Sequence, residues 1–133
     1  MRHSRRGFFH RIAATLGLTA LLPAVTTAKG KKVAVPLKKV AKLQQVGGST
    51  VLKIKDEWIL FVRSSTAEIK AVSATCTHKK CDVNYNAGSK GIECACHGSK
   101  FTVDGKVLNG PATSNLHNYN ATLSGDKIVL KIK

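Results

Sequence analysis

The sequence of 133 residues predicts an all-β fold, and three observations support this prediction. Apolar residues and lysines alternate over 127–133, as in a strand that buries one of its faces. The dipeptides Asp104-Gly105 and Gly125-Asp126 each separate two short apolar runs, which is typical of β-hairpins. No helical period of useful length follows residue 30, and the sequence contains no internal repeats.

The first expected strands follow the glycine pair at 47–48. Residues 51–55 alternate between apolar and lysine side chains, which indicates a half-buried strand. Residues 58–62 form a continuous apolar run that is short enough for a buried strand. A turn at 64–65 leads to a third strand at 68–73, and this strand delivers the chain to the first cysteine.

The second half of the chain alternates strands with turns. The polar run 84–90, followed by Gly91, predicts a turn that folds one cysteine-rich segment onto another. Two hairpins are expected after it. The first pairs 101–103 with 106–108, and the second pairs 116–123 with 128–133.

Residues 1–28 are expected to be a targeting segment rather than part of the fold. Arg5-Arg6 followed by Phe8-Phe9 resembles a twin-arginine signal, and the 17 residues of 12–28 carry no charge. The alternatives are a general secretory signal and an uncleaved membrane tether formed by 8–28. We favour a cleaved signal of the twin-arginine type, which would export a folded domain to the periplasm.

The charge of the chain is strongly positive. The formal net charge of the whole chain is +15. Residues 29–133 contain 17 lysines, one arginine and all seven acidic residues, so this part has a net charge of +11. Arg63 is the only arginine in that part, so forked contacts to phosphate or guanine are scarce, and nucleic acid is not the expected partner. An acidic protein or a membrane surface fits better. Residues 29–48 are expected to be a basic linker, because Pro36 disfavours regular structure.

The residues that carry chemistry lie between Cys76 and Phe101. This stretch contains all four cysteines, arranged around Cys76-x-His78 and Cys94-x-x-His97. Thiolates together with imidazoles select zinc, copper or an iron–sulfur cluster over magnesium or calcium. A structural zinc ion and a pair of plain disulfides are the alternatives, but neither explains a histidine after the first cysteine of each pair.

The two motifs resemble those of the Rieske family, in which two histidines and two cysteines bind one [2Fe–2S] cluster. The matching segments are Cys76-Thr77-His78-x-x-Cys81 and Cys94-x-Cys96-His97-Gly98-Ser99, followed by an aromatic residue. The resemblance implies that Cys76 and Cys94 bind one iron and that His78 and His97 bind the other. It further implies a disulfide between Cys81 and Cys96, which pins the two loops together.

The same resemblance implies the rest of the architecture. A base subdomain of stacked antiparallel sheets would carry a cluster-binding subdomain, within a domain that covers 49–133. Ser99 would donate a hydrogen bond to a bridging sulfide, and Gly110-Pro111 would belong to a loop that covers the cluster. Phe101 stands where high-potential members have a tyrosine, and phenylalanine has no hydroxyl to donate to a ligand sulfur.

Lys79-Lys80 is the main departure from the family pattern, because quinol-oxidising members usually have Leu-Gly there. In those members the leucine belongs to an apolar tip that docks on cytochrome b, where two ammonium groups would be costly to bury. We therefore expect an exported one-electron carrier whose Lys79 and Lys80 meet an acidic redox protein such as a cytochrome.

Three alternatives remain at the level of sequence. The chain could be the Rieske subunit of a cytochrome bc-type quinol oxidoreductase, the small subunit of a periplasmic oxidase, or a zinc-stabilised binding module. A ring-hydroxylating oxygenase is not expected, because such chains lack the second cysteine pair and carry a large catalytic domain that 133 residues cannot contain.

Overall fold

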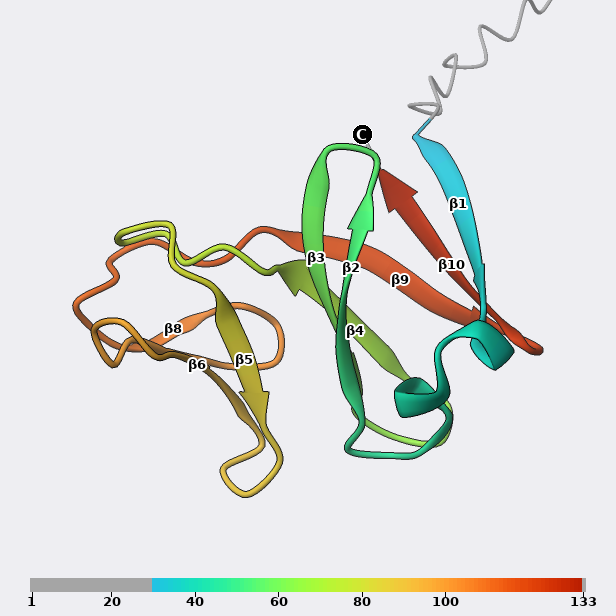
Figure 1. Ribbon diagram of the computed structural model, residues 1–133, viewed down its shortest axis with the longest axis horizontal. Coiled ribbons are helices and arrows are strands. Elements are labelled where there is room, and N and C mark those ends of the chain that lie inside the picture. Colours follow the sequence, from blue (N-terminus) through green and yellow to red (C-terminus); the bar gives the residue numbers. More distant parts are fainter. Residues whose placement is uncertain (1–29, 133) are drawn as a thin grey trace, which may run out of the picture.

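The computed structural model describes residues 30–132, and the predicted all-β class is confirmed for this part of the chain (Figure 1). Two antiparallel sheets account for all its strands. The larger sheet contains β1 (Lys31–Pro36), β2 (Ser49–Ile54), β3 (Glu57–Arg63), β4 (Ile69–Ser73), β9 (Asn118–Ser124) and β10 (Lys127–Ile132). The smaller contains β5 (Val83–Asn86), β6 (Gly91–Cys94), β7 (Lys100–Phe101) and β8 (Val107–Asn109).

The larger sheet forms the base, with the strand order β1-β10-β9-β4-β3-β2. Its two halves are joined by a short pairing of β4 with β9, in which Ala71 lies opposite Tyr119 and Val72 opposite Asn118. The smaller sheet is an insertion between β4 and β9, with the order β5-β6-β7-β8. In Figure 1 this insertion lies on the left and β1 with β10 on the right, so the two are at opposite ends of the view.

Strand β3 is buried on both faces, as its continuous apolar run predicts. Ile59 and Phe61 belong to the core of the base, whereas Leu60 and Val62 pack into a second core that extends into the insertion. The prediction fails at Trp58, a residue near the start of the strand that is 54% exposed. There the ammonium of Lys53, the residue opposite in β2, lies 5.7 Å from the centre of the indole ring.

The predicted hairpins are present. Strand β9 pairs with β10 across the Gly125-Asp126 turn, and Ile128, Leu130 and Ile132 are buried as their alternation predicts. Strands β7 and β8 also pair, although β7 is one residue shorter than the predicted run and β8 begins one residue later than predicted. The turn between them needs Gly105, which has φ +88° and whose added Cβ would lie 2.8 Å from the carbonyl oxygen of Leu116.

One turn is shorter than predicted. The expected turn at 84–90 is shorter, because residues 84–86 continue β5 and pair with β6. These polar residues can form a strand because Asn84 and Asn86 are exposed. The hairpin still folds the two cysteine-rich segments together, as expected.

The linker prediction for 29–48 is wrong over the described part. Lys31–Pro36 forms β1, which pairs with β10 over its full length, so the domain begins well before residue 49. Two 3-10 helices follow, η1 (Leu37–Lys39) and η2 (Ala41–Gln44), and Leu43 of η2 is fully buried. Pro36 is tolerated because β1 is an edge strand and Pro36 ends it.

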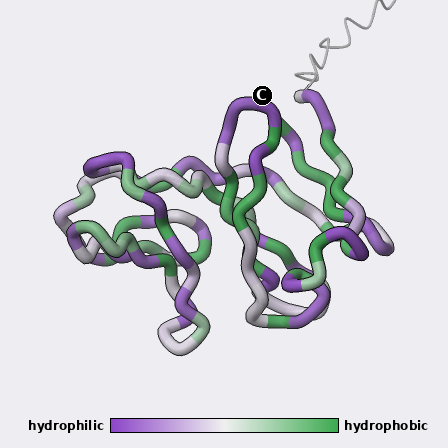
Figure 2. Tube along the Cα trace, viewed as in Figure 1, coloured by the Kyte–Doolittle hydropathy of each residue, from purple (hydrophilic) through white to green (hydrophobic). Residues whose placement is uncertain are grey.

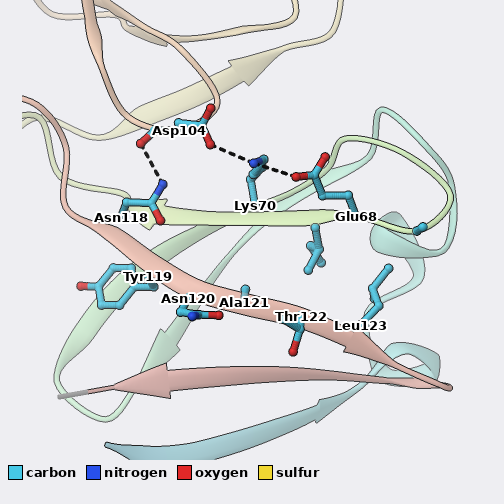
Figure 3. Close-up of a pocket in the computed structure, with 11 residues that line it drawn as sticks. Glu68, Lys70, Asp104, Asn118, Tyr119, Asn120, Ala121, Thr122 and Leu123 are labelled. Atoms are coloured by element: carbon cyan, nitrogen blue, oxygen red, sulfur yellow. Dashed lines mark hydrogen bonds and ion pairs between the residues drawn. The ribbon is translucent and has the colours of Figure 1, made fainter. Parts of the chain in front are cut away.

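The base and the insertion are joined by charged groups. The Lys70 ammonium of β4 lies 2.9 Å from an Asp104 carboxylate oxygen in the insertion and 2.7 Å from one of Glu68 (Figure 3). The Asn118 side-chain amide donates to the carbonyl oxygen of Asp104 at 2.9 Å. These residues line an open pocket of about 520 Å³ beside β4 and β9, which contains no cysteine or histidine.

Within residues 30–132, no helix is long and apolar enough to cross a membrane. The predicted twin-arginine signal and the alternative tether at 8–28 lie outside the described residues. Figure 2 shows where hydrophilic residues gather along the trace, including the turn between β2 and β3.

Candidate functional site

Two loops of the insertion have the same backbone hydrogen bonds and place the two cysteine motifs. In the first loop (76–81), the Cys76 amide donates to the Cys81 carbonyl at 2.7 Å and the Lys80 amide to the Cys76 carbonyl at 2.9 Å. In the second (94–99), the Cys94 amide donates to the Ser99 carbonyl at 2.8 Å and the Gly98 amide to the Cys94 carbonyl at 3.1 Å. The repeated pattern makes Cys76 and Cys94 equivalent.

The thiols of Cys76 and Cys94 are free and almost fully buried, with 1% and 2% of each residue exposed. Both residues belong to the core that the insertion shares with β3. Strand β6 ends at Cys94, whereas Cys76 follows the chain out of β4, so both strands fix the start of a loop. The structure therefore offers two buried sulfur donors at equivalent positions.

The two histidines of the motifs lie against each other. The rings of His78 and His97 are 4.9 Å apart between centroids and nearly perpendicular, at 84°. His78 is half-buried and His97 is exposed. Among the described residues, the Nδ1 atom of His78 has no hydrogen-bond partner although it is buried. A buried polar atom without a partner is costly, which marks this nitrogen as a candidate metal ligand.

Cys81 and Cys96 form a disulfide that joins the two loops, with their Cα atoms 6.3 Å apart. The implied pairing is thus present in the structure. The sulfurs of Cys81, Cys96 and Cys94 lie within 4.8 Å of one another. This trio is not itself a metal site, because two of its sulfurs are bonded together and are unavailable as thiolates.

A third loop (110–114) forms hydrogen bonds with both cysteine-containing loops, 76–81 and 94–99. The fully buried Ser99 accepts a hydrogen bond on its Oγ from the Ala112 amide at 3.0 Å. The Thr77 hydroxyl donates to the Ser114 carbonyl at 2.7 Å. Gly110-Pro111, which has a cis peptide bond, begins this loop. The hydrogen bond between Thr77 and Ser114 was not predicted from the sequence. A threonine between Cys76 and His78 was the only local sign that a hydroxyl could act there.

Phe101 is completely buried in the core that contains Cys76 and Cys94. It lies opposite Ile92 of β6, two residues before Cys94. Side chains two apart on a strand point to the same face, so Phe101 packs on the face of β6 that carries the Cys94 sulfur. Phe101 and both thiols thus belong to one buried core.

Lys79 and Lys80 are both exposed in the first loop, next to His78. Neither forms an ion pair with any residue of the described part. Their charges are thus free to act on molecules that approach the histidines.

The site fits the group that the motifs imply. Two buried free thiols and two neighbouring imidazoles, one of them with a buried nitrogen that has no partner among the described residues, offer two sulfurs and two nitrogens as candidate ligands. Such a set suits iron or zinc. The histidines lie toward solvent and the cysteines toward the core, so one side of a bound group would face water.

Comparison with known proteins identifies the family. Residues 33–120 match the family model described as the Rieske [2Fe-2S] domain. The cytochrome b6-f complex iron-sulfur subunit of Chlorobaculum tepidum is 30% identical, over 96% of this chain and 75% of its own. That of Chlorobaculum thiosulfatiphilum is 29% identical, over 95% of this chain and 74% of its own.

Solved structures agree with this result. The cyanobacterial plasma membrane Rieske protein PetC3 from Synechocystis PCC 6803 is 33% identical, with a TM-score of 0.63 over 74% of this chain and 98% of that chain. The ferredoxin of carbazole 1,9a-dioxygenase from Nocardioides aromaticivorans has a TM-score of 0.64 over 77% of this chain and 99% of that chain. At 22% identity, the second likeness shows the fold alone. The matched domain, the relatives and the disulfide-linked loops agree: this chain belongs to the Rieske family and carries a [2Fe–2S] domain.

Proposed function

We propose that this chain is an exported single-electron carrier that passes electrons between redox partners outside the cytoplasm. The Cys76 and Cys94 thiolates would hold one iron of its [2Fe–2S] cluster, and the His78 and His97 imidazoles the other. When bound, this group accepts and returns one electron at a potential above that of plant-type ferredoxins.

One observation carries the proposal. The two free thiols are buried at equivalent loop positions, while of the two imidazoles that follow them His78 is half-buried and His97 is exposed. In this arrangement, core residues would shield the side of the cluster that the thiolates bind. The electron would enter and leave through the imidazoles on the other side. Phe101 would exclude water from the sulfur side, and the Ser99 hydroxyl, fixed by Ala112, would donate to a bridging sulfide.

The proposed partner is an acidic redox protein such as a cytochrome. Lys79 and Lys80 are exposed beside His78 and carry no counter-charge from the described residues, so an acidic surface would be drawn to the exit point of the electron. Export would follow the twin-arginine route, for which Arg5-Arg6 and the uncharged run at 12–28 are the support. The Cys81–Cys96 disulfide suits an oxidising compartment such as the periplasm.

A second candidate is a subunit of a cytochrome bc-type quinol oxidoreductase, because the relatives described above are cytochrome b6-f subunits. We rank it second, since a tip with two ammonium groups is a poor match for an apolar docking site. The small subunit of a periplasmic oxidase would use the same basic tip toward a catalytic subunit.

The cofactor content tests the proposed ligand set. Protein purified without oxygen should contain about two irons and two acid-labile sulfides per chain, and should give a Rieske-type EPR signal when reduced. One zinc ion per chain without iron would instead support a zinc-stabilised binding module and would end the electron-carrier proposal.

A further inference from the structure

The outer face of the strands β1, β10 and β9 is basic. Residues that lie side by side in register share a face of a sheet, and three such rows cross these strands on the side away from the core. We call these rows the basic face: they are Lys32, Lys131 and Asn120; then Ala34, Val129 and Thr122; then Pro36, Lys127 and Ser124. The residues between them, Val33, Val35, Ile128 and Leu130 among others, pack into the core of the base.

The basic face carries an uncompensated charge. Lys32 lies directly opposite Lys131, and two like charges in that arrangement destabilise a sheet. The strands β1, β9 and β10 contain no acidic residue. Asp126, in the turn beside Lys127, is the nearest acid in sequence, and no lysine of this face forms an ion pair with a described residue. Folding alone gives no reason for this pair of lysines.

The lysines continue along the chain that follows β1. Lys38 and Lys39 of η1 and Lys42 of η2 are exposed, and the sequence from residue 30 to residue 55 contains no acid at all. Figure 2 shows hydrophilic segments at the start of β1 and at the turn between β9 and β10. The positive charge of the protein is thus concentrated at the end of the base that carries β1.

The chemistry of the basic face suits a lipid surface better than a protein. Its charges are lysines, without an arginine or an aromatic residue, whereas protein interfaces concentrate Trp, Tyr and Arg in their energetic centres. Its middle row has only small or medium side chains, so the face has no anchor to fill a pocket. Anionic bilayers attract such lysines through their surface potential, without a matching shape.

We propose that the basic face docks the base subdomain on an anionic lipid bilayer, with the insertion directed away from it. The strands that carry the lysines of the face, β1 and β10, lie at the opposite end of the view from the insertion in Figure 1, so this contact would leave the histidines accessible to a soluble partner. The uncharged run at 12–28 ends just before β1 in sequence, which would bring the face to the same membrane if that run served as a tether. The proposal is independent of electron transfer, because vesicle binding needs neither cluster nor partner.

Vesicle sedimentation with the full chain tests the proposal. Vesicles of phosphatidylcholine with 30% phosphatidylglycerol should bind the protein more tightly than vesicles of phosphatidylcholine alone. We call the ratio of the two affinities the anionic excess, and we ascribe only this excess to the basic face. Each lysine near such a surface contributes about fivefold in affinity, so Lys32→Glu with Lys131→Glu should reduce the excess by about thirtyfold or more. Salt at 1 M should abolish it.

The control variant, Lys90→Glu with Lys106→Glu, changes the net charge equally but alters exposed lysines of the insertion. It should keep most of the excess binding. Equal losses in the two variants would show that only net charge matters and would overturn the proposal, as would an unchanged excess in both. Binding of polyglutamate without any excess for anionic vesicles would also overturn it, in favour of an acidic protein.

A stability measurement separates binding from folding. Lys131→Glu alone places a carboxylate opposite Lys32, so the melting temperature should rise by roughly 1–5 °C while the anionic excess falls. A variant that is more stable but binds less would show that Lys131 serves the surface rather than the fold. If this variant bound anionic vesicles as well as the unaltered chain does, the basic face would not be the contact.

Discussion

Lys80 and Gly98 occupy equivalent positions in the two loops of the site, and both have a left-handed backbone, with φ of +56° and +77°. Each donates its amide hydrogen to the carbonyl of the cysteine four residues earlier, Cys76 or Cys94. Glycine adopts this conformation freely, but a residue with a Cβ is strained by it. The first loop therefore keeps a lysine where its own geometry favours glycine.

Replacing Lys80 by glycine should stabilise the protein. Relief of left-handed strain is worth about 1–2 kcal/mol, and the greater freedom of glycine in the unfolded chain offsets about 0.5–1 kcal/mol of it. We expect a net gain of roughly 0.5–1 kcal/mol in the free energy of unfolding, measured with urea. Lys79→Gly is the control, because Lys79 does not have a positive φ, and it should lose stability. A loss in both variants would contradict the role of strain at residue 80.

The cysteines should separate into two functional classes. Cys76→Ser should abolish cluster assembly, because it removes a proposed ligand. Cys81→Ser with Cys96→Ser should leave some cluster, in a protein that loses iron faster and is less stable by about 2–4 kcal/mol. Iron and sulfide contents, followed over time, check both outcomes. If the double variant assembled as little cluster as Cys76→Ser, the division between ligands and disulfide would be wrong.

Phe101→Tyr should raise the reduction potential. Phe101 is fully buried in the core that contains Cys76 and Cys94, and a hydroxyl there could donate to a ligand sulfur and favour the more negative reduced state. A gain of about 1.4 kcal/mol in favour of that state corresponds to about 59 mV for one electron. Phe101→Leu, which adds no donor, is the control in a redox titration. An unchanged or lower potential in the tyrosine variant would mean that its hydroxyl does not reach the cluster.

The Lys70 bridge should give stability a plateau between about pH 4.5 and pH 10.5. Hydrogen bonds to Glu68 and Asp104 raise the pKa of Lys70, so its contribution is complete below its ordinary pKa of 10.5 and is lost as the pH rises. A hydrogen bond from Lys70 lowers the pKa of Glu68, so this contribution is complete above 4.5 and is lost as the pH falls. Unfolding in urea from below pH 4.5 to above pH 10.5 measures both limits.

Asp104→Asn tests the same bridge, since it removes one carboxylate but keeps the backbone carbonyl that binds Asn118. Because both partners are partly exposed, we expect a loss below about 1 kcal/mol. In a double-mutant cycle with Lys70→Met, the two effects should not be additive. Additive losses would show that the charges do not interact.

Local patterns were sufficient to predict most of the fold and the convergence of the site. Alternation predicted β2 and β10, the continuous apolar run predicted β3, and the glycine turns predicted the hairpins. Strand β1 was missed because its partner, β10, is almost a hundred residues away and pairs Lys32 with Lys131. The six residues of β1 begin with two lysines and end with Pro36, and nothing in this short segment indicates which strand it pairs with.

Contacts between distant residues could not be predicted for the same reason. The bridge from Lys70 to Asp104 depends on how the insertion folds back on β4, which no local pattern encodes. The motifs indicated that Cys76, His78, Cys94 and His97 act together. The structure buries both thiols in one core and places the two imidazole rings against each other, and the four residues stay the predicted ligand set. The strain at Lys80 was missed, because lysine as a residue type favours a backbone with negative φ. The glycine that related sequences usually have at this position was the signal that could have predicted it.

The partner of the site can be identified from the salt dependence of electron transfer. Lys79→Glu with Lys80→Glu should slow transfer to an acidic c-type cytochrome mainly by slowing association, because both exposed lysines directly follow His78, whose ring lies against the exposed His97. The loss should shrink as the Debye length falls from about 10 Å in 0.1 M salt to about 3 Å in 1 M salt. Lys90→Glu with Lys106→Glu, the matched change of charge elsewhere on the insertion, should have a smaller effect.

A quinol-docking tip would behave differently, and one further variant separates the two cases. Lys79→Leu with Lys80→Gly restores the residues that the family resemblance places there and also relieves the strain at residue 80. If the tip meets an acidic protein, this variant should lose association rate at low salt even though it is more stable. If the tip meets cytochrome b, its turnover with such a complex should improve with little salt dependence, because burying two ammonium groups is costly and burying leucine is favourable. Rates with the acidic cytochrome that do not respond to either double substitution at low salt would exclude Lys79 and Lys80 as its docking site.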